Sequence, residues 1–109
     1  MSTTAIPAAP PYVAYSTCTE TVIPADRWGA AYASLQALKG HVQEYPGLQH
    51  FDVFVGAESD GSVRVHVYTT WDTAVQRDVF LERGYTFERM LADVVEIPPH
   101  RTLVMEKVF

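Results

Sequence analysis

The sequence predicts one α+β domain, with a four-stranded antiparallel sheet and two helices on one of its faces. The first observation is the order of its patterned segments, which is strand, helix, strand, strand, helix, strand. The second is composition, because 109 residues with 48% hydrophobic and 12% aromatic residues can bury one core. With right-handed crossovers, this order gives the split βαβ arrangement.

The N-terminal half contains an arm, one strand and one helix. Residues 1–11 combine prolines with small residues and are expected to form a flexible arm, so the domain spans residues 12–109. Residues 12–22 (YVAYSTCTETV) are rich in β-branched and aromatic residues and predict the first strand. Asp26 then offers a cap or first-turn acid for a helix that ends at the YPG of residues 45–47. One apolar stripe at helical spacing supports this helix: Trp28, Tyr32, Leu35, Leu38 and Val42.

A hairpin follows, made of residues 48–56 (LQHFDVFVG) and 63–71 (VRVHVYTTW). Asp60-Gly61 between these two runs is a strong turn signal. A two-residue turn there predicts that one sheet face collects His50, Asp52, Phe54, Val67, Thr69 and Trp71. The other face then collects Arg64, His66, Tyr68 and Thr70 against Phe51, Val53 and Val55. A four-residue loop keeps these assignments, whereas a loop of odd length exchanges the partners.

The last part of the chain predicts a second helix and a closing strand. Asp72 and Thr73 are placed to cap the helix. Gly84 lies midway along it and is expected to kink or divide it. After the turn IPPH, residues 101–109 (RTLVMEKVF) predict the final strand. The apolar positions of the helix are Ala74, Val75, Phe80, Leu81, Phe87, Met90 and Leu91.

Both faces of the predicted sheet carry bulky residues, although the helices of a split βαβ fold, also called ferredoxin-like, cover only one. A wide apolar face without cover implies a partner. The simplest partner is a second copy of the chain, so we expect a homodimer that packs sheet against sheet.

Composition and motifs exclude several classes of function. A formal charge of −5 with scattered basic residues argues against a nucleic-acid-binding surface. No apolar run is long enough for a membrane span, and the N-terminus lacks the pattern of a signal peptide. Cys18 is the only cysteine, so no intrachain disulfide forms, and we expect a cytoplasmic protein. The sequence has no phosphate loop, dinucleotide fingerprint or clustered metal ligands, so we predict no cofactor and no metal.

Three stretches, EYPGLQHFDVF (44–54), SDGSVRVHVYTTWDT (59–73) and FERML (87–91), together resemble the antibiotic biosynthesis monooxygenase family. The resemblance extends over residues 12–109 and implies a dimeric α+β barrel. Members of that family include cofactor-free oxygenases of aromatic polyketides, haem-degrading enzymes and quinol oxygenases. By resemblance to the polyketide oxygenases, Trp71 faces a pocket between sheet and helices, and Arg89 helps to hold the substrate there.

The sequence also departs from the family's patterns. Val67 stands where the polyketide oxygenases carry an asparagine, and Gln76 and Arg77 occupy the region of their pocket tyrosine. The haem degraders carry a tryptophan inside the second helix where this chain has Asp78. These differences argue against haem degradation and leave the identity of the pocket residues open.

The candidate catalytic residues are His50 and Asp52, two residues apart on one predicted face. A neutral imidazole oriented by a carboxylate can remove a proton from a phenol or an activated C–H group. The alternative is a polar pair near a strand end, just as Trp71 has the alternative of a core anchor. The candidate substrate-binding residues are Trp71, Arg89, Thr69, Val67 and Phe54.

The function expected from these residues and the resemblance is that of a cofactor-independent monooxygenase. Its substrates would be a planar phenolic or polyketide-like aromatic compound and O2. Two alternatives stay open: an isomerase or cyclase that uses the same pocket, and a non-catalytic ligand-binding accessory dimer.

Overall fold

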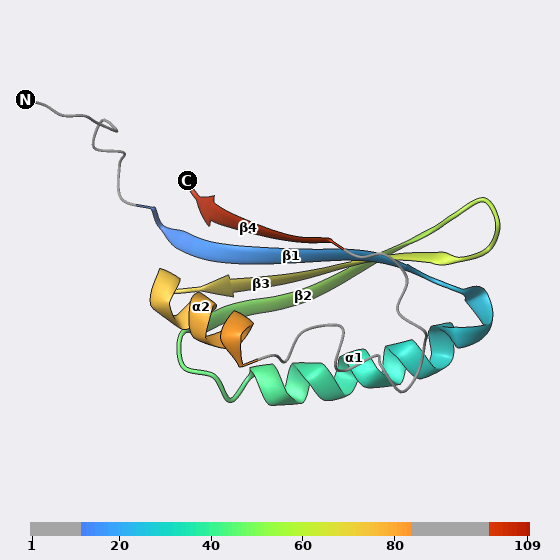
Figure 1. Cartoon of the computed structure of the whole chain (residues 1–109), viewed down its shortest axis with the longest axis horizontal. Helices are drawn as coiled ribbons and strands as arrows, with labels where there is room; N and C mark the ends of the chain where they lie inside the picture. The colour runs from blue at the N-terminus through green and yellow to red at the C-terminus, as the bar shows by residue number, and fades with distance from the viewer. Residues whose placement is uncertain (1–11, 84–100) are drawn as a thin grey trace, which may run out of the picture.

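The computed structural model describes residues 12–83 and 101–109, which form the predicted order of elements (Figure 1). The elements are β1 (Ala14–Ile23), a 3₁₀ turn (Ala25–Arg27), α1 (Trp28–Val42), β2 (Leu48–Ala57), β3 (Val63–Trp71), α2 (Ala74–Glu82) and β4 (Arg101–Lys107). The sheet has the order β2-β3-β1-β4, and all neighbouring strands are antiparallel. Both helices lie on one face of the sheet (Figure 1). The predicted α+β, ferredoxin-like fold is therefore confirmed.

Local chemistry determines where the helices begin and end. Thr73 caps α2 as predicted, since its Oγ1 accepts a hydrogen bond of 3.2 Å from the backbone N–H of Gln76. Asp26 lies in the first turn of the 3₁₀ segment but makes no side-chain cap there. Gly47, in the turn between α1 and β2, adopts a φ of 88°, which glycine tolerates without a steric cost. The break predicted at Gly84 lies outside the described residues.

The hairpin between β2 and β3 forms where it was predicted, but its register differs. The backbone N–H of Glu58 donates to the carbonyl of Ser62 at 2.9 Å, which leaves the three residues 59–61 as the loop. Gly61 takes a left-handed φ of 88°, as a three-residue hairpin loop requires. The loop is therefore odd in length, and His50 pairs with Thr70 rather than with Trp71. The predicted distribution of residues between the two faces was consequently wrong.

A β-bulge interrupts β2 close to its start. Leu48 is opposite the last residue of β3 and His50 is opposite the residue before it, so Gln49 is an extra residue. The bulge allows both Leu48 and Phe51 to pack against the core. In a regular strand, a spacing of three residues would point these side chains to opposite faces. The side chain of Gln49 donates a hydrogen bond of 2.7 Å to Asp72.

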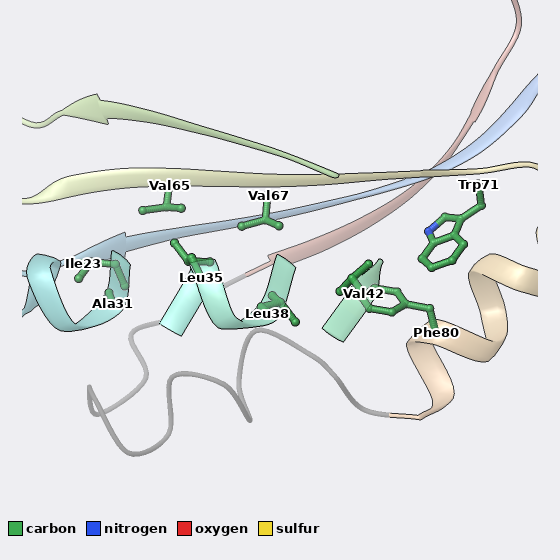
Figure 2. Close-up of a cluster of buried hydrophobic side chains, with 9 residues drawn as sticks. All are labelled: Ile23, Ala31, Leu35, Leu38, Val42, Val65, Val67, Trp71 and Phe80. Atoms are coloured by element: carbon green, nitrogen blue, oxygen red, sulfur yellow. The ribbon is translucent and has the colours of Figure 1, made fainter. Parts of the chain in front are cut away.

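The hydrophobic core lies between the sheet and the two helices (Figure 2). From the predicted stripe of α1, Leu35, Leu38 and Val42 are buried in it. Trp28 is only partly buried and Tyr32 is 52% exposed, so one side of α1 remains available to a ligand. The other core residues are Ile23, Ala31, Val65, Val67, Trp71 and Phe80.

The opposite side of the sheet, which we call the open face, is not covered by any described helix (Figure 1). The strand registers place these side chains on it: Ser16, Cys18, Glu20, Val22, His50, Asp52, Phe54, Arg64, His66, Tyr68, Thr70, Arg101, Leu103 and Met105. Phe54 is 62% exposed on this face. Within residues 12–83 and 101–109, no helix has the length and hydropathy needed to span a membrane.

Candidate functional site

The observed register divides the predicted site between the two faces of the sheet. His50, Asp52 and Phe54 lie on the open face, because they pair with Thr70, Tyr68 and His66 of β3. Val67, Thr69 and Trp71 face the helices instead. The prediction that His50 and Trp71 lie on the same face of the sheet was therefore wrong. A hairpin loop of odd length exchanges the partners of every residue along the two strands.

Trp71 is an anchor of the core in the described part of the chain. It is 0% exposed, and its ring packs against Phe80 at 5.2 Å and Tyr45 at 6.3 Å between ring centroids. Its Nε1 donates a hydrogen bond of 2.8 Å to the Oγ1 of Thr69, which is bonded in turn to the hydroxyl of Thr17 at 2.5 Å. This hydroxyl pair satisfies the indole N–H inside the core, as a buried tryptophan requires.

His50 and Asp52 are both exposed on the open face. Among residues 12–83 and 101–109, neither side chain has a hydrogen-bond or ion-pair partner, so the carboxylate does not orient the imidazole. In the described part of the chain they are two separate polar residues on a solvent-facing strand, so the alternative of a polar pair that satisfies itself is not seen either. The predicted acid–base role of the pair gains no geometric support.

A groove opens between α1 and the edge strand β2. It has a volume of about 310 Å³ and is lined by Trp28, Tyr32, Leu35, Gln36, Lys39, Phe51, Val53 and Val55. The strand residues alternate, so all three point toward the helices. The helix residues share one side of α1 because their spacings follow its 3.6-residue period. The groove therefore forms where one side of α1 lies beside the alternate residues of the edge strand β2.

The walls of this α1–β2 groove are aromatic and its rim is polar. Trp28 and Tyr32 meet edge to face, with ring centroids 5.8 Å apart. Phe51 supplies a third aromatic ring from β2. Gln36 donates a hydrogen bond of 3.5 Å to the hydroxyl of Tyr32, and Lys39 adds an ammonium group. The groove therefore offers flat apolar contacts together with hydrogen-bond donors and one positive charge.

Arg77 on α2 is a buried cation that joins the helix to the sheet. Its guanidinium lies 5.6 Å from the ring centre of Tyr15, within the range of a cation–π contact. It donates to the carbonyl of Met105 at 3.3 Å and contacts the carboxylates of Asp78 at 3.1 Å and Glu106 at 3.7 Å. These contacts satisfy its charge within the protein and indicate a structural role.

The α1–β2 groove was not predicted from the sequence as a site. The predicted apolar stripe of the first helix did contain two of its residues, Trp28 and Tyr32. In the structure these two lie toward one side of the stripe and are not fully buried. Lys39 follows Tyr32 by seven residues, which places it on the same side of the helix. Arg89, the predicted substrate-holding residue, lies outside the described residues.

No family model and no curated protein matches the sequence. Solved structures do match over most of their length. A proposed antibiotic biosynthesis monooxygenase from Nitrosomonas europaea has a TM-score of 0.71 at 17% identity, covering 91% of this chain and 94% of that one. A structure named antibiotic biosynthesis monooxygenase has a TM-score of 0.64 at 13% identity, covering 87% and 99% of the two chains.

A third similar structure is named as a dimeric protein of unknown function with a ferredoxin-like fold, from Bacteroides fragilis. Its TM-score is 0.64 at 8% identity, and the match covers 85% of this chain and 95% of that one. At these identities the comparisons establish the fold. The predicted resemblance to the antibiotic biosynthesis monooxygenases is thus confirmed at the level of the fold.

Proposed function

We propose that this chain is a small-molecule enzyme that binds a planar aromatic compound in the α1–β2 groove, as a cofactor-independent monooxygenase. The observation that carries the proposal is the groove itself, whose lining combines aromatic, aliphatic and polar side chains. Its volume of about 310 Å³ lies at the lower end of the range for small-molecule sites. The names of the similar structures add support for monooxygenase chemistry.

The aromatic side chains select for flat substrates in this proposal. Trp28, Tyr32 and Phe51 offer ring faces and edges that stack with an aromatic ligand. Val53 and Val55 complete an apolar floor, which favours a ligand with little charge. Substrates of the phenolic or polyketide type combine such flat rings with a few oxygen atoms.

Lys39 is the residue to which we assign the stabilisation of negative charge. Its exposed side chain is among those that line the groove, where an ammonium group would favour the phenolate or enolate form of a bound phenol or ketone. The electron-rich anion can then transfer one electron to O2, and recombination of the two radicals gives a hydroperoxide. Loss of water from that hydroperoxide converts a CH2 group into a ketone, so that substrate and O2 give product and H2O.

His50 and Asp52 do not line this groove, since they lie on the open face. The predicted role of His50 as a catalytic base therefore remains a separate hypothesis, which a His50→Ala variant tests in the same assay. Val67, Thr69 and Trp71 support the sheet beneath the helices rather than the groove itself. Arg89 remains a predicted substrate contact.

The open face is the surface that we assign to a homodimer. Phe54 is largely exposed there beside Tyr68, with ring centroids 5.7 Å apart, and Leu103 and Met105 extend the apolar surface onto β4. Sheet-against-sheet packing would bury these side chains. The mass of the protein in solution at micromolar concentration tests this assignment, and a monomeric mass would contradict it. Phe54→Glu should convert a dimer into monomers.

The first experiment is oxygen uptake by the metal-free protein with anthrone-like and hydroquinone-like phenols, without added flavin, haem or nicotinamide. We expect uptake above the uncatalysed rate, and a reduction of about tenfold or more in kcat/KM for Lys39→Gln, since one charge-assisted contact is worth about 1.5–3 kcal/mol. Lys107→Gln is the matched control, because Lys107 is the only other lysine and does not line the groove. Equal losses in the two variants would contradict the assignment of Lys39.

Fluorescence places the ligand independently of turnover, because the chain has two tryptophans in different environments. Trp28 lines the groove, whereas Trp71 is buried in the core. We expect an aromatic ligand to quench wild-type fluorescence, and Trp28→Phe to remove most of that quenching.

The alternative functions give different results in these two assays. An isomerase or cyclase would change the absorption spectrum of the substrate without consuming oxygen. A ligand-binding accessory dimer would show saturable quenching and no turnover. Absence of uptake, turnover and quenching would contradict the assignment of the groove as a ligand site.

A further inference from the structure

We propose that Cys18, Glu20 and His66 form a binding site for a divalent zinc-type ion on the open face. The Sγ of Cys18, a carboxylate oxygen of Glu20 and a ring nitrogen of His66 all lie within 4.8 Å of one another. These residues are not part of the α1–β2 groove, so the inference does not rest on the proposed enzymatic activity. They lie on the open face, which is also the surface assigned to the homodimer.

The sheet itself brings these three side chains together. Cys18 and Glu20 are two residues apart on β1, so both point to the same face. His66 is the direct cross-strand partner of Glu20 on β3. Adjacent strands place such side chains about 4.5–5.5 Å apart at their Cβ atoms. The cluster therefore stands on the two central strands of the sheet, where the backbone is held on both sides.

The donor set matches the chemistry of zinc. A thiolate, an imidazole and a carboxylate are the three side-chain ligand types that Zn²⁺ takes, at about 2.0–2.3 Å from the ion. Ligand atoms around a tetrahedral ion at those distances are about 3.3–3.8 Å apart. The three ligand atoms lie up to 4.8 Å apart without an ion, so the side chains must draw closer together to reach that geometry. Three protein ligands leave a fourth position for a further ligand.

The neighbouring side chains support the proposed ligands. Arg101 on β4 donates two hydrogen bonds, of 2.8 and 3.2 Å, to the Oε2 of Glu20, and neither bond uses Oε1. Such outer contacts to a ligating carboxylate are typical of metal sites. Cys18 is 1% exposed, and Tyr68 is its direct cross-strand neighbour on β3.

Burial raises the pKa of the Cys18 thiol above its ordinary value, and the hydrogen bond from Tyr68 opposes this effect only in part. The thiol is therefore protonated at neutral pH in the absence of an ion, and an ion must displace that proton to bind. Of the other charged groups around the sulfur, Glu20 raises the pKa further and Arg101 lowers it.

The test is a titration of the untagged, metal-free full-length chain with Co²⁺, which substitutes for zinc and is visible by absorption. We expect one ion per chain, a thiolate-to-cobalt charge-transfer band in the near ultraviolet, and displacement of both cobalt and this band by Zn²⁺. Cys18→Ser should abolish the charge-transfer band, and His66→Gln should weaken binding by about tenfold or more.

His50→Gln is the matched control, because His50 lies on the same face but outside the cluster. Its cobalt spectrum and affinity should equal those of the wild type. Circular dichroism of Cys18→Ser and His66→Gln checks that both variants are folded, and Glu20→Gln replaces either variant that is not. Cobalt binding without a thiolate band, or an unchanged affinity in the folded variants, would overturn the proposal.

Discussion

Replacing Trp71 tests whether this residue is a core anchor or a wall of a ligand pocket. The side chain is 0% exposed, packs against Phe80 and Tyr45, and donates a hydrogen bond to Thr69. Truncation of such a residue to alanine costs about 3–5 kcal/mol of the free energy of unfolding. Because a domain of this size has about 5–15 kcal/mol in total, Trp71→Ala is expected to be close to the limit of folding.

Trp71→Phe is the more informative variant, because it keeps an aromatic ring in the core. It loses the hydrogen bond to Thr69, worth about 1 kcal/mol, and part of the buried ring area. Thr69 keeps its bond to Thr17, so no polar group is left without a partner. The expected loss is therefore about 1–3 kcal/mol.

Urea unfolding followed by circular dichroism at one fixed protein concentration measures this loss. Trp28→Phe is the matched control, since Trp28 is only partly buried and its replacement should cost about 1 kcal/mol or less. Ligand quenching should persist in Trp71→Phe, through Trp28. If Trp71→Phe kept the stability of the wild type but lost its affinity for aromatic ligands, our account of Trp71 as a core anchor would be refuted.

Two further predictions concern the turns. Gly47→Ala should destabilise the protein by about 1–2 kcal/mol, because a φ of 88° is strained for any side chain and an added Cβ would collide with Gln76. Gly40→Ala, at a helical position with open space around it, should instead leave the midpoint of thermal unfolding unchanged or raise it. In the hairpin loop, the hydroxyl and backbone N–H of Ser62 hold the pKa of Asp60 below its ordinary value. The contribution of these hydrogen bonds to the stability of the fold is therefore present above the unfolded-state pKa of about 3.9, and it is lost as the pH falls through the lower folded-state pKa. An NMR titration that gave Asp60 a pKa at or above about 3.9 would contradict this prediction.

The order of elements could be predicted from the sequence because each has its own periodicity and its own end signals. Thr73 begins α2 by a local hydrogen bond, and Gly47 ends the turn after α1 by its backbone conformation, so neither depends on distant contacts. The closing strand, predicted over residues 101–109 after the turn IPPH, forms from Arg101 to Lys107.

The register could not be predicted, because a single residue decides it. Asp60-Gly61 is compatible with a two-residue turn and with a longer loop, and the sequence signal for both is the same. The chain adopts a three-residue loop, closed by the bond between Glu58 and Ser62. This difference moves His50 away from Trp71 and so divides the predicted site.

The two sites that the structure suggests depend on tertiary pairing. The α1–β2 groove requires Lys39 on a helix to lie near Phe51 on a strand that follows it. The Cys18, Glu20 and His66 cluster requires β1 to pair with β3, which are separated in the chain by a helix and another strand. A hairpin signal relates only neighbouring strands, so neither arrangement follows from local patterns.

Because of the bulge at Gln49, the effect of deleting one residue from β2 depends on where in the strand the deletion falls. Deleting Gln49 would leave Leu48 next to His50, so that regular alternation alone would direct Leu48 and Phe51 toward the helices. Such a deletion would cost chiefly the hydrogen bond to Asp72. Deleting Val53 instead would reverse the orientation of every residue on one side of the gap. We therefore expect one-residue deletions to be accepted at the start of β2 and rejected at its centre.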